Sequence, residues 1–367
     1  MKLETWRYFD YWLIGAVAIV IIFSIAMIDS SIAGNPELIE NNTVQRQIIF
    51  SGIGFALIVL VTLLDYHFWA SIGRVMYVAV AIFLAIIAFS GSGEEAFGSA
   101  RWLNVGFAVV QPSELAKITI IVLAADFFAR NQDRIGDLIW IARSSVLTFA
   151  LVALILQQPD LSTSITLVVI WAALLFASGL KGKHIALFVV GGLILMVAAY
   201  PFLAEYQQQR ITNFLFTDPD ARFGEEYNVR QALITVGSGG WLGQGYGQGT
   251  QVQLRFLKVR HSDFIFSAIS EEFGFVGAVV LMLFLFFIIY RILYNARNAR
   301  DTYGALLCYG VATLIAFQTV INIGMNLKLL PVTGLPLPLV SQGGSSLLSI
   351  MLGIGIVESV AARQKIS

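Results

Sequence analysis

The sequence predicts an all-α, polytopic membrane protein of about ten transmembrane helices, and three observations support this fold class. Hydrophobic residues make up 57% of the 367 residues and charged residues only 13%, roughly half the charged share of a soluble domain. Mean hydropathy is +0.79. Apolar runs of about 20 residues, the length that crosses a bilayer, recur along the chain. We therefore expect residues 1–367 to form a single integral membrane domain.

Ten spans are predicted, and the longest connection between them is residues 204–263. They cover residues 11–28, 47–64, 72–89, 114–128, 144–156, 163–180, 184–203, 264–290, 303–325 and 347–362. No small-residue cleavage site follows the first apolar stretch, so we expect it to be retained as a helix. The fourth and fifth spans are short and have polar outer ends, which indicates that both pack inside the bundle.

Basic residues predict the orientation of the bundle, because cytoplasmic loops are enriched in Lys and Arg. With the N-terminus inside, the cytoplasmic connections contain Lys2, Arg7, Arg74, Arg130, Arg134, Arg143, Lys181, Lys183, Arg291, Arg297, Arg300, Arg363 and Lys365. An even number of helices places both termini in the cytoplasm. Residues 204–263 then form a large extracytoplasmic loop between helices 7 and 8, and all eight prolines fall on the same outer side.

Charged residues near the outer ends of spans are expensive and therefore candidates for function. Glu114 and Lys117 stand three apart in QPSELAK, which suits either a structural ion pair or a functional site about equally. Asp160, in QPDLST, either caps the helix that follows, which local sequence slightly favours, or projects into a cavity of the bundle. Asp263 directly precedes an apolar helix, and a helix cap and a functional carboxylate are equally compatible with that position.

Two irregular segments add to the outer face. The segment 335–346, LPLPLVSQGGSS, is apolar yet interrupts helix repeatedly, and such backbone is tolerated at membrane depth only where protein buries it or it lines a cavity. The glycine-rich segment 237–249 is typical of a flexible loop and lacks the spacing of a phosphate-binding P-loop. Arg255, Lys258 and Arg260 follow it, and this basic cluster suits either a pyrophosphate or lipid headgroups.

Four motifs together resemble the SEDS family of bacterial cell-wall polymerases. They are QPSELAK at 111–117, QPDLST at 158–163, RHSDFIFSAISEEFG at 260–274 and PVTGLPLPLVSQGGSS at 331–346, in that order over nearly the whole chain. TGLPLP and GTQVQLRFL, at 249–257, are similar to the elongation and rod-shape branch rather than the division branch. The stretch LKVR at 257–260 departs from the LPE-like wording usual in the family, which leaves the basic surface there undefined.

The resemblance implies a peptidoglycan glycosyltransferase that polymerises lipid II into glycan strands during cell elongation and cell-shape maintenance. It implies a site that faces outward from the bacterial inner membrane and inverts the anomeric carbon in a single displacement. By this resemblance Asp263 is the essential residue, which we interpret as the general base, and Glu114, Lys117 and Asp160 are its polar neighbours. The residues expected to bind substrate are Arg101, Arg210, Arg255, Arg260, Ser345 and Ser346.

The resemblance also implies binding partners. These are lipid II, the undecaprenyl-pyrophosphate-linked glycan, a class B penicillin-binding protein acting as transpeptidase, and other proteins of the elongation complex. Nothing predicts a nucleic-acid partner. No metal motif is present, although a divalent cation, Mg²⁺ or Mn²⁺, would suit the charge of the leaving group.

Two alternative functions remain open at this point. A lipid II flippase predicts essential polar groups across the full membrane depth, whereas the candidates here gather at the outer end. A non-catalytic scaffold of the elongation machinery predicts that replacing Asp263 by Ala has no effect.

Overall fold

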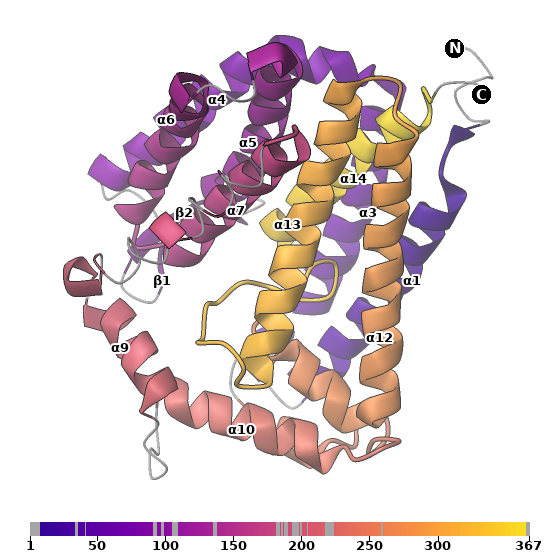
Figure 1. The fold of residues 1–367 in the computed structure, drawn as a ribbon. Coiled ribbons are helices and arrows are strands. Elements are labelled where there is room, and N and C mark those ends of the chain that lie inside the picture. Colours follow the sequence, from indigo (N-terminus) through magenta and orange to yellow (C-terminus); the bar gives the residue numbers. More distant parts are fainter. Residues whose placement is uncertain are drawn as a thin grey trace.

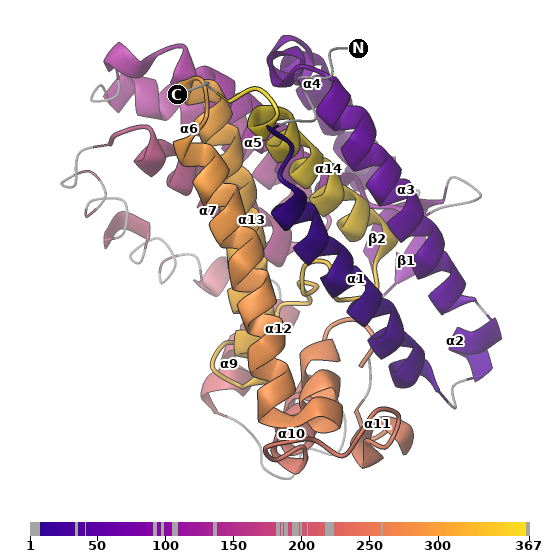
Figure 2. The same ribbon diagram turned by 90° about the vertical axis from the view of Figure 1, so that its right-hand side faces the viewer.

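The fold of the chain is a bundle of long helices, and most described residues are helical (Figures 1 and 2). The computed structural model describes residues 8–33, 36–40, 42–90, 94–96, 99–104, 109–134, 138–180, 200–203, 205–216, 224–257 and 260–364, with isolated positions between 184 and 198. Seven candidate spans within these residues are long and apolar enough to cross a membrane. The predicted class of polytopic membrane protein is therefore confirmed.

Nine of the ten predicted spans coincide with a helix of the described residues, and the seventh, 184–203, lies mostly outside them. Those helices are α1 (Tyr11–Ile32), α3 (Thr43–Leu63), α4 (Tyr66–Ser90), α5 (Pro112–Ala129), α6 (Leu138–Leu156), α7 (Leu161–Ala177), α12 (Ile265–Arg297), α13 (Thr302–Asn326) and α14 (Gly344–Ala361). Shorter helices are α2 (Pro36–Glu40), η2 (Gln132–Arg134), η3 (Tyr200–Phe202), α9 (Glu205–Leu215), α10 (Gly224–Ser238) and α11 (Thr250–Gln253).

A small antiparallel sheet that the sequence did not predict joins α4 to α5. Its strands β1 (Glu94–Ala96), β2 (Ser99–Asn104) and β3 (Val109–Val110) pair in the order β1-β2-β3. Each strand is short, so the alternation of residues along it is too brief to give a recognisable period in the sequence.

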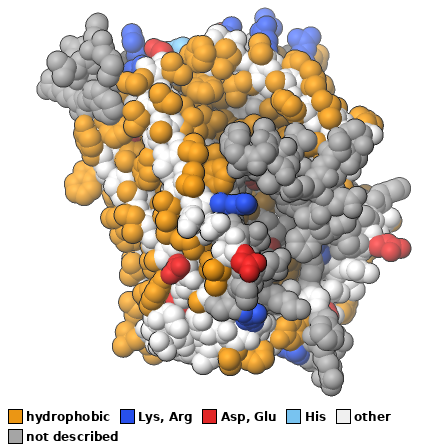
Figure 3. All heavy atoms as spheres, turned by 180° about the vertical axis from the view of Figure 1, so that it is seen from behind, with side chains coloured by type: hydrophobic (Ala, Val, Ile, Leu, Met, Phe, Trp, Pro, Cys, Tyr) orange, Lys and Arg blue, Asp and Glu red, His pale blue; other side chains and the backbone are white. Residues whose placement is uncertain are grey.

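Helix α5 lies inside the bundle, where it packs against α4, α7 and α13. Its burial confirms the prediction for the fourth span. The prediction was wrong for the fifth span, because α6 exposes one apolar face at Ile139 and Val146. Two polar residues of α6, Ser144 and Thr148, are buried, and Trp171 Nε1 donates to Ser144 Oγ at 3.0 Å. Apolar side chains cover much of the surface seen in Figure 3, and Lys and Arg gather along its upper edge.

Both ends of the described chain lie at one end of the bundle (Figure 1). Asp10 N donates to Glu358 Oε2 at 3.0 Å, and the Arg363 guanidinium donates to the carbonyl of Thr62 at 3.1 Å. Helices α9 and α10 lie at the opposite end (Figure 1). We call these the terminal end and the loop end of the bundle.

The segment 204–263 contains helices α9, α10 and α11. Its glycine-rich part packs closely against a break in α12 at Gly274, whose φ of 67° is left-handed. Gln244 N donates to the carbonyl of Glu271 and Phe275 N to that of Gly240, at 2.9 and 2.8 Å. A Cβ on Gly243 would lie 2.2 Å from the Glu272 carbonyl oxygen, so only glycine allows this approach.

Candidate functional site

The connection between α13 and α14, residues 327–343, runs without regular secondary structure into the bundle. Its Leu335, Leu337 and Val340 are buried. Side chains from other elements satisfy its backbone: Asn322 Nδ2 donates to Leu335 O at 2.8 Å, and Ser24 Oγ donates to Val340 O at 2.6 Å. The predicted helix-breaking segment is thus buried protein, as its depth requires.

Asp263 lies immediately before α12 and is bound through its backbone to α13. Its carbonyl oxygen accepts from Asn322 Nδ2 at 3.1 Å and from Asn326 Nδ2 at 3.0 Å. The N-cap residue of α12 is Phe264, so the interpretation of Asp263 as the helix cap is wrong. A Cβ on Gly334 would lie 3.9 Å from Asp263 Oδ2, which places this half-buried carboxylate beside the 327–343 segment.

The residues before Asp263 are joined to the same segment. Ser341 Oγ donates to Ser262 O at 2.6 Å, and Gln342 N donates to His261 O at 3.0 Å. Burial and the neighbouring Arg260 guanidinium lower the pKa of His261 to about 4. Its ring is therefore neutral at pH 7.

Asp160 caps α7, as the local sequence slightly favoured. Its Oδ1 accepts from Thr163 N at 3.0 Å and its Oδ2 from Thr163 Oγ1 at 2.8 Å. Gln111 Nε2 also lies 3.4 Å from Asp160 Oδ2, and Gln111 N donates to Ser345 Oγ at 3.3 Å. Gln111 thus connects the start of α7 with the start of α14.

Glu114 and Lys117 form a buried ion pair in the first turns of α5. Lys117 Nζ lies 2.7 Å from Glu114 Oε2, and the two side chains are 0% and 6% exposed. Neither atom has a further hydrogen-bond partner within the described part of the chain. Ser349 Oγ, on α14, donates to Glu114 O at 2.8 Å.

Two neighbouring residues of the 327–343 segment lie beside two of these positions. Ser162, next but one to Asp160, donates to the carbonyl of Thr333, and Gly334 then lies beside the Asp263 carboxylate. Ser162, in the first turn of α7, and Asp263, just before α12, therefore lie next to two neighbouring residues of this segment. The carboxylate, amide and hydroxyl groups around this segment can orient a sugar hydroxyl and accept its proton.

The predicted arginines differ in position. Arg260 is buried, and its guanidinium donates to the carbonyls of Ser31 and Leu257 while Nη2 has no partner among the described residues. Arg210 is half-buried on α9, and Arg255 is exposed. Arg101 belongs to β2, but its side chain lies outside the described part, as does Lys258. Ser345 and Ser346 are half-buried at the start of α14.

The structure adds residues that motif reasoning missed. Asn322 and Asn326 are fully buried and bind the Asp263 backbone, and Asn326 Oδ1 accepts from Ser267 Oγ at 2.7 Å. The sequence signal that could have identified them is the pair of Asn side chains at the end of an apolar span. Glu271 is also fully buried, and its carboxylate accepts from Gln251 N at 2.8 Å.

The described side chains do not fit a divalent cation held by the protein alone. Within them, no group of three or more His, Cys, Asp or Glu side chains could hold a metal ion. Both Asp160 oxygens already accept from Thr163. We therefore assign no step to a metal.

Comparison with known proteins relates this site to cell-wall synthesis. Residues 6–366 match the family described as "Cell cycle protein", which covers FtsW, RodA and SpoVE. The chain is 37% identical to peptidoglycan glycosyltransferase MrdB of Escherichia coli K12, over 82% of this chain and 80% of MrdB. It is 33% identical to a probable peptidoglycan glycosyltransferase FtsW of Hydrogenovibrio crunogenus, over 97% of this chain and 94% of that protein.

Solved structures agree with these relatives. A chain from a peptidoglycan synthase complex, studied for the coordination of polymerisation and crosslinking, matches 98% of this chain and 99% of its own length, with a TM-score of 0.83 and 28% identity. RodA of Thermus thermophilus matches over 98% of both chains, with a TM-score of 0.73 and 28% identity. Together with the match over almost its full length, these findings show that the chain belongs to the FtsW, RodA and SpoVE family, the SEDS family that its motifs resemble.

Proposed function

We propose that the chain is a peptidoglycan glycosyltransferase that polymerises lipid II during cell elongation. The observation that carries the proposal is the Asp263 carboxylate beside the 327–343 segment, on a residue whose backbone carbonyl is held by two buried amides at the loop end. Relatives along most of the chain are named for the same activity. The site supplies the carboxylate that a glycosyl transfer to a sugar hydroxyl requires.

In the proposed reaction the C4 hydroxyl of an incoming lipid II sugar attacks C1 of the growing glycan. Asp263 takes the hydroxyl proton as the new C–O bond forms, and undecaprenyl pyrophosphate leaves with the bonding pair. A single displacement inverts the anomeric carbon and needs no carboxylate nucleophile. A positioned base of this kind contributes roughly 10²–10⁴-fold to the rate.

Positive charge near the leaving pyrophosphate lowers the barrier further. Lys117 is the best-placed candidate, because Glu114 fixes its ammonium inside the bundle. Asp160 and Gln111 act as positioning residues, since their bonds hold α7 and α14 around the 327–343 segment. Arg101, Arg210, Arg255, Arg260, Ser345 and Ser346 are proposed to contact the two lipid-linked substrates.

The proposed location is the bacterial inner membrane, with the terminal end in the cytoplasm and the loop end outside. The basic residues along the terminal end support this orientation (Figure 3). We also propose a class B penicillin-binding protein as partner, because the similar structure with the TM-score of 0.83 comes from a complex that couples polymerisation to crosslinking.

The decisive experiment is polymerisation of purified lipid II by the full chain with its transpeptidase, comparing wild type with Asp263→Asn. We expect the variant to lose at least about 100-fold in rate. Asp29→Asn is the matched control, because Asp29 is an exposed carboxylate at the loop end of α1. Polymer from Asp263→Asn at the wild-type rate would overturn the assignment of the base.

The same preparation separates the two alternative functions. Transfer of lipid II across vesicle membranes without any polymer would favour the flippase. Normal rod growth in cells that carry only Asp263→Ala would favour the scaffold.

A further inference from the structure

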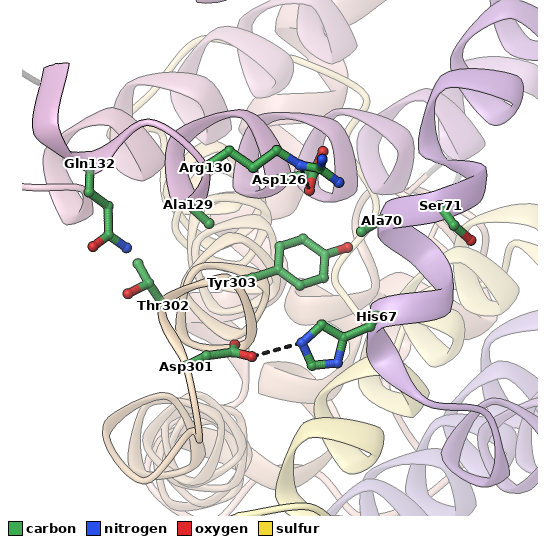
Figure 4. Close-up of a pocket in the computed structure, with 10 residues that line it drawn as sticks. All are labelled: His67, Ala70, Ser71, Asp126, Ala129, Arg130, Gln132, Asp301, Thr302 and Tyr303. Carbon is green, nitrogen blue, oxygen red and sulfur yellow. Dashed lines mark hydrogen bonds and ion pairs between the residues drawn. The ribbon is translucent and has the colours of Figure 1, made fainter.

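A cavity lies at the terminal end of the bundle, far from Asp263 along α13. Its volume is about 490 Å³, within the range of small-molecule sites. It opens between the start of α4, the end of α5 and the start of α13 (Figure 4). The lining residues are His67, Ala70, Ser71, Asp126, Ala129, Arg130, Gln132, Asp301, Thr302 and Tyr303. None of them has a role in the proposed glycosyl transfer.

The hydroxyl of Tyr303 is the first sign that this cavity takes a ligand. Tyr303 is only 6% exposed, and its hydroxyl has no hydrogen-bond partner among the described residues. Figure 4 shows its ring between Asp126 and Arg130 on one side and His67 on the other. A buried hydroxyl without a partner is destabilising, so a ligand that donates to its oxygen would relieve a defect already built into the fold.

Charges of both signs line the cavity, and most are already engaged. Asp301 accepts from Gly304 N at 2.7 Å, from Tyr66 Oη at 2.9 Å and from His67 Nε2 at 2.8 Å. His67 Nδ1 lies 2.8 Å from Asp65 Oδ1. Both ring nitrogens of His67 therefore face carboxylates within the protein.

Asp126 and Arg130 have capacity for a ligand. Arg130 Nε donates to Asp126 Oδ1 at 2.7 Å, and the arginine side chain is 60% exposed. A carboxylate accepts several hydrogen bonds and a guanidinium donates up to five. A cation near Asp126 and Tyr303 and an anion near Arg130 would therefore both be accommodated, which indicates a ligand that has both charges.

The depth of the cavity indicates the source of that ligand. Tyr66 and Thr302 begin two of the candidate membrane spans, and the lining residues of α4 and α13 belong to their first turns or lie just before them. The cavity is therefore at the level of lipid headgroups. Arg363 Nε lies 3.5 Å from Asp65 Oδ2, just before α4, so the cavity is at the terminal end of the bundle.

We propose that this cavity binds the headgroup of an aminophospholipid. The primary ammonium donates to Tyr303 Oη and to Asp126, and the phosphate lies against the Arg130 guanidinium. A trimethylammonium headgroup has no N–H to donate, and a headgroup with only an anion brings no cation to Asp126. The proposal rests on the membrane assignment of the fold and is independent of the glycosyl transfer.

The test is native mass spectrometry of the full-length protein, delipidated in detergent and titrated with phosphatidylethanolamine, phosphatidylcholine or phosphatidylglycerol of the same acyl chains. We expect phosphatidylethanolamine to bind about tenfold more tightly than phosphatidylcholine, as one hydrogen bond to a charged group would provide. Tyr303→Phe and Asp126→Asn should each remove most of this preference. Tyr309→Phe, two turns further along α13, is the matched control and should retain it.

Several outcomes would overturn the proposal. These are equal binding of phosphatidylethanolamine and phosphatidylcholine, an unchanged preference in Tyr303→Phe and Asp126→Asn, or tightest binding of phosphatidylglycerol, which would mark a site for anions alone. Binding of a lysine-rich peptide without any binding of phosphatidylethanolamine would overturn the proposal and indicate a protein partner instead. Unfolding temperatures of the variants show whether each is folded, and the two single substitutions provide independent tests.

Discussion

At the scale of single residues, the buried pair of Glu114 and Lys117 gives the sharpest prediction of stability. Lys117→Met would leave the Glu114 carboxylate buried without a counter-charge, which costs roughly 3–5 kcal/mol. The double variant Glu114→Leu/Lys117→Met removes both charges and should recover most of that loss. Thermal unfolding of the purified protein in detergent measures the two effects.

Polymerisation assays of the same variants separate folding from function. The double variant should be folded but inactive if Lys117 neutralises the leaving group. Wild-type stability of Lys117→Met alone would contradict the burial of an unpaired Glu114 carboxylate.

A second prediction concerns His261, whose pKa is lowered from 6.5 to about 4 by burial and Arg260. Between these two values the unfolded chain binds the proton and the folded chain does not. Stability therefore falls as the pH drops from about 6.5 to 4, by roughly 3 kcal/mol at most, and levels off below.

His261→Gln should flatten this part of the stability profile, because glutamine does not titrate. His67→Gln is the control and should keep the fall, since His67 lies at the other end of the bundle between two carboxylates. Melting temperatures at pH 7.5, 6.0 and 4.5 check both variants. An identical acid loss in His261→Gln would refute the role of this imidazole.

Local spacing predicted site residues only where their partners are close in the sequence. The pair of Glu114 and Lys117 and the cap at Asp160 each involve residues three apart, and both were anticipated. The bonds from Asn322 and Asn326 to Asp263 join residues 59 and 63 positions apart. No local rule indicates such contacts, so the sequence alone could not exclude a helix cap at Asp263.

At the scale of elements, glycines determine how closely the end of α10 approaches α12. A Cβ on Gly239 would lie 1.9 Å from the Ser270 carbonyl oxygen, whereas a Cβ on Gly237 meets nothing within 4 Å. Gly239→Ala should therefore destabilise the protein strongly, because backbone rather than a flexible side chain would have to move. Gly237→Ala, in the last turn of α10, should be neutral or stabilising by up to about 1 kcal/mol.

Thermal unfolding compares the two glycine variants directly, and polymerisation shows whether the shift reaches the site through α12. Equal stability of Gly239→Ala and Gly237→Ala would contradict the close contact. The glycine-rich stretch suggested a flexible loop from its composition. Instead it packs on α12, because Glu271 and the break at Gly274 provide bonding groups that composition alone does not reveal.

The helices were the most predictable elements, because apolar length alone identifies a span. The packing of α6 was not predictable, because polar residues at a helix end do not tell which face is buried. In the structure Ser144 of α6 accepts from Trp171 of α7, and Val146 lies on the exposed face of α6. Apolar residues cover both sides of a membrane helix, so hydropathy gives little sign of its inner face.

At the scale of the whole molecule, the fold separates two ends with different chemistry. The loop end contains Asp263, the re-entrant 327–343 segment and helices α9 to α11. The terminal end contains both ends of the described chain, the basic residues of Figure 3 and the cavity around Tyr303. A polymerase with substrates in the outer leaflet requires the loop end outside and the terminal end in the cytoplasm.

This orientation can be tested with single cysteines, because the native Cys308 is fully buried and should not react. Gln209→Cys places a thiol on an exposed position of α9 at the loop end, and Asn298→Cys places one on the exposed cap of α12 at the terminal end. A membrane-impermeant maleimide should label intact spheroplasts only at position 209. Position 298 should react only after permeabilisation. The reverse pattern would place Asp263 in the cytoplasm, where the lipid-linked glycan of the proposed reaction does not grow.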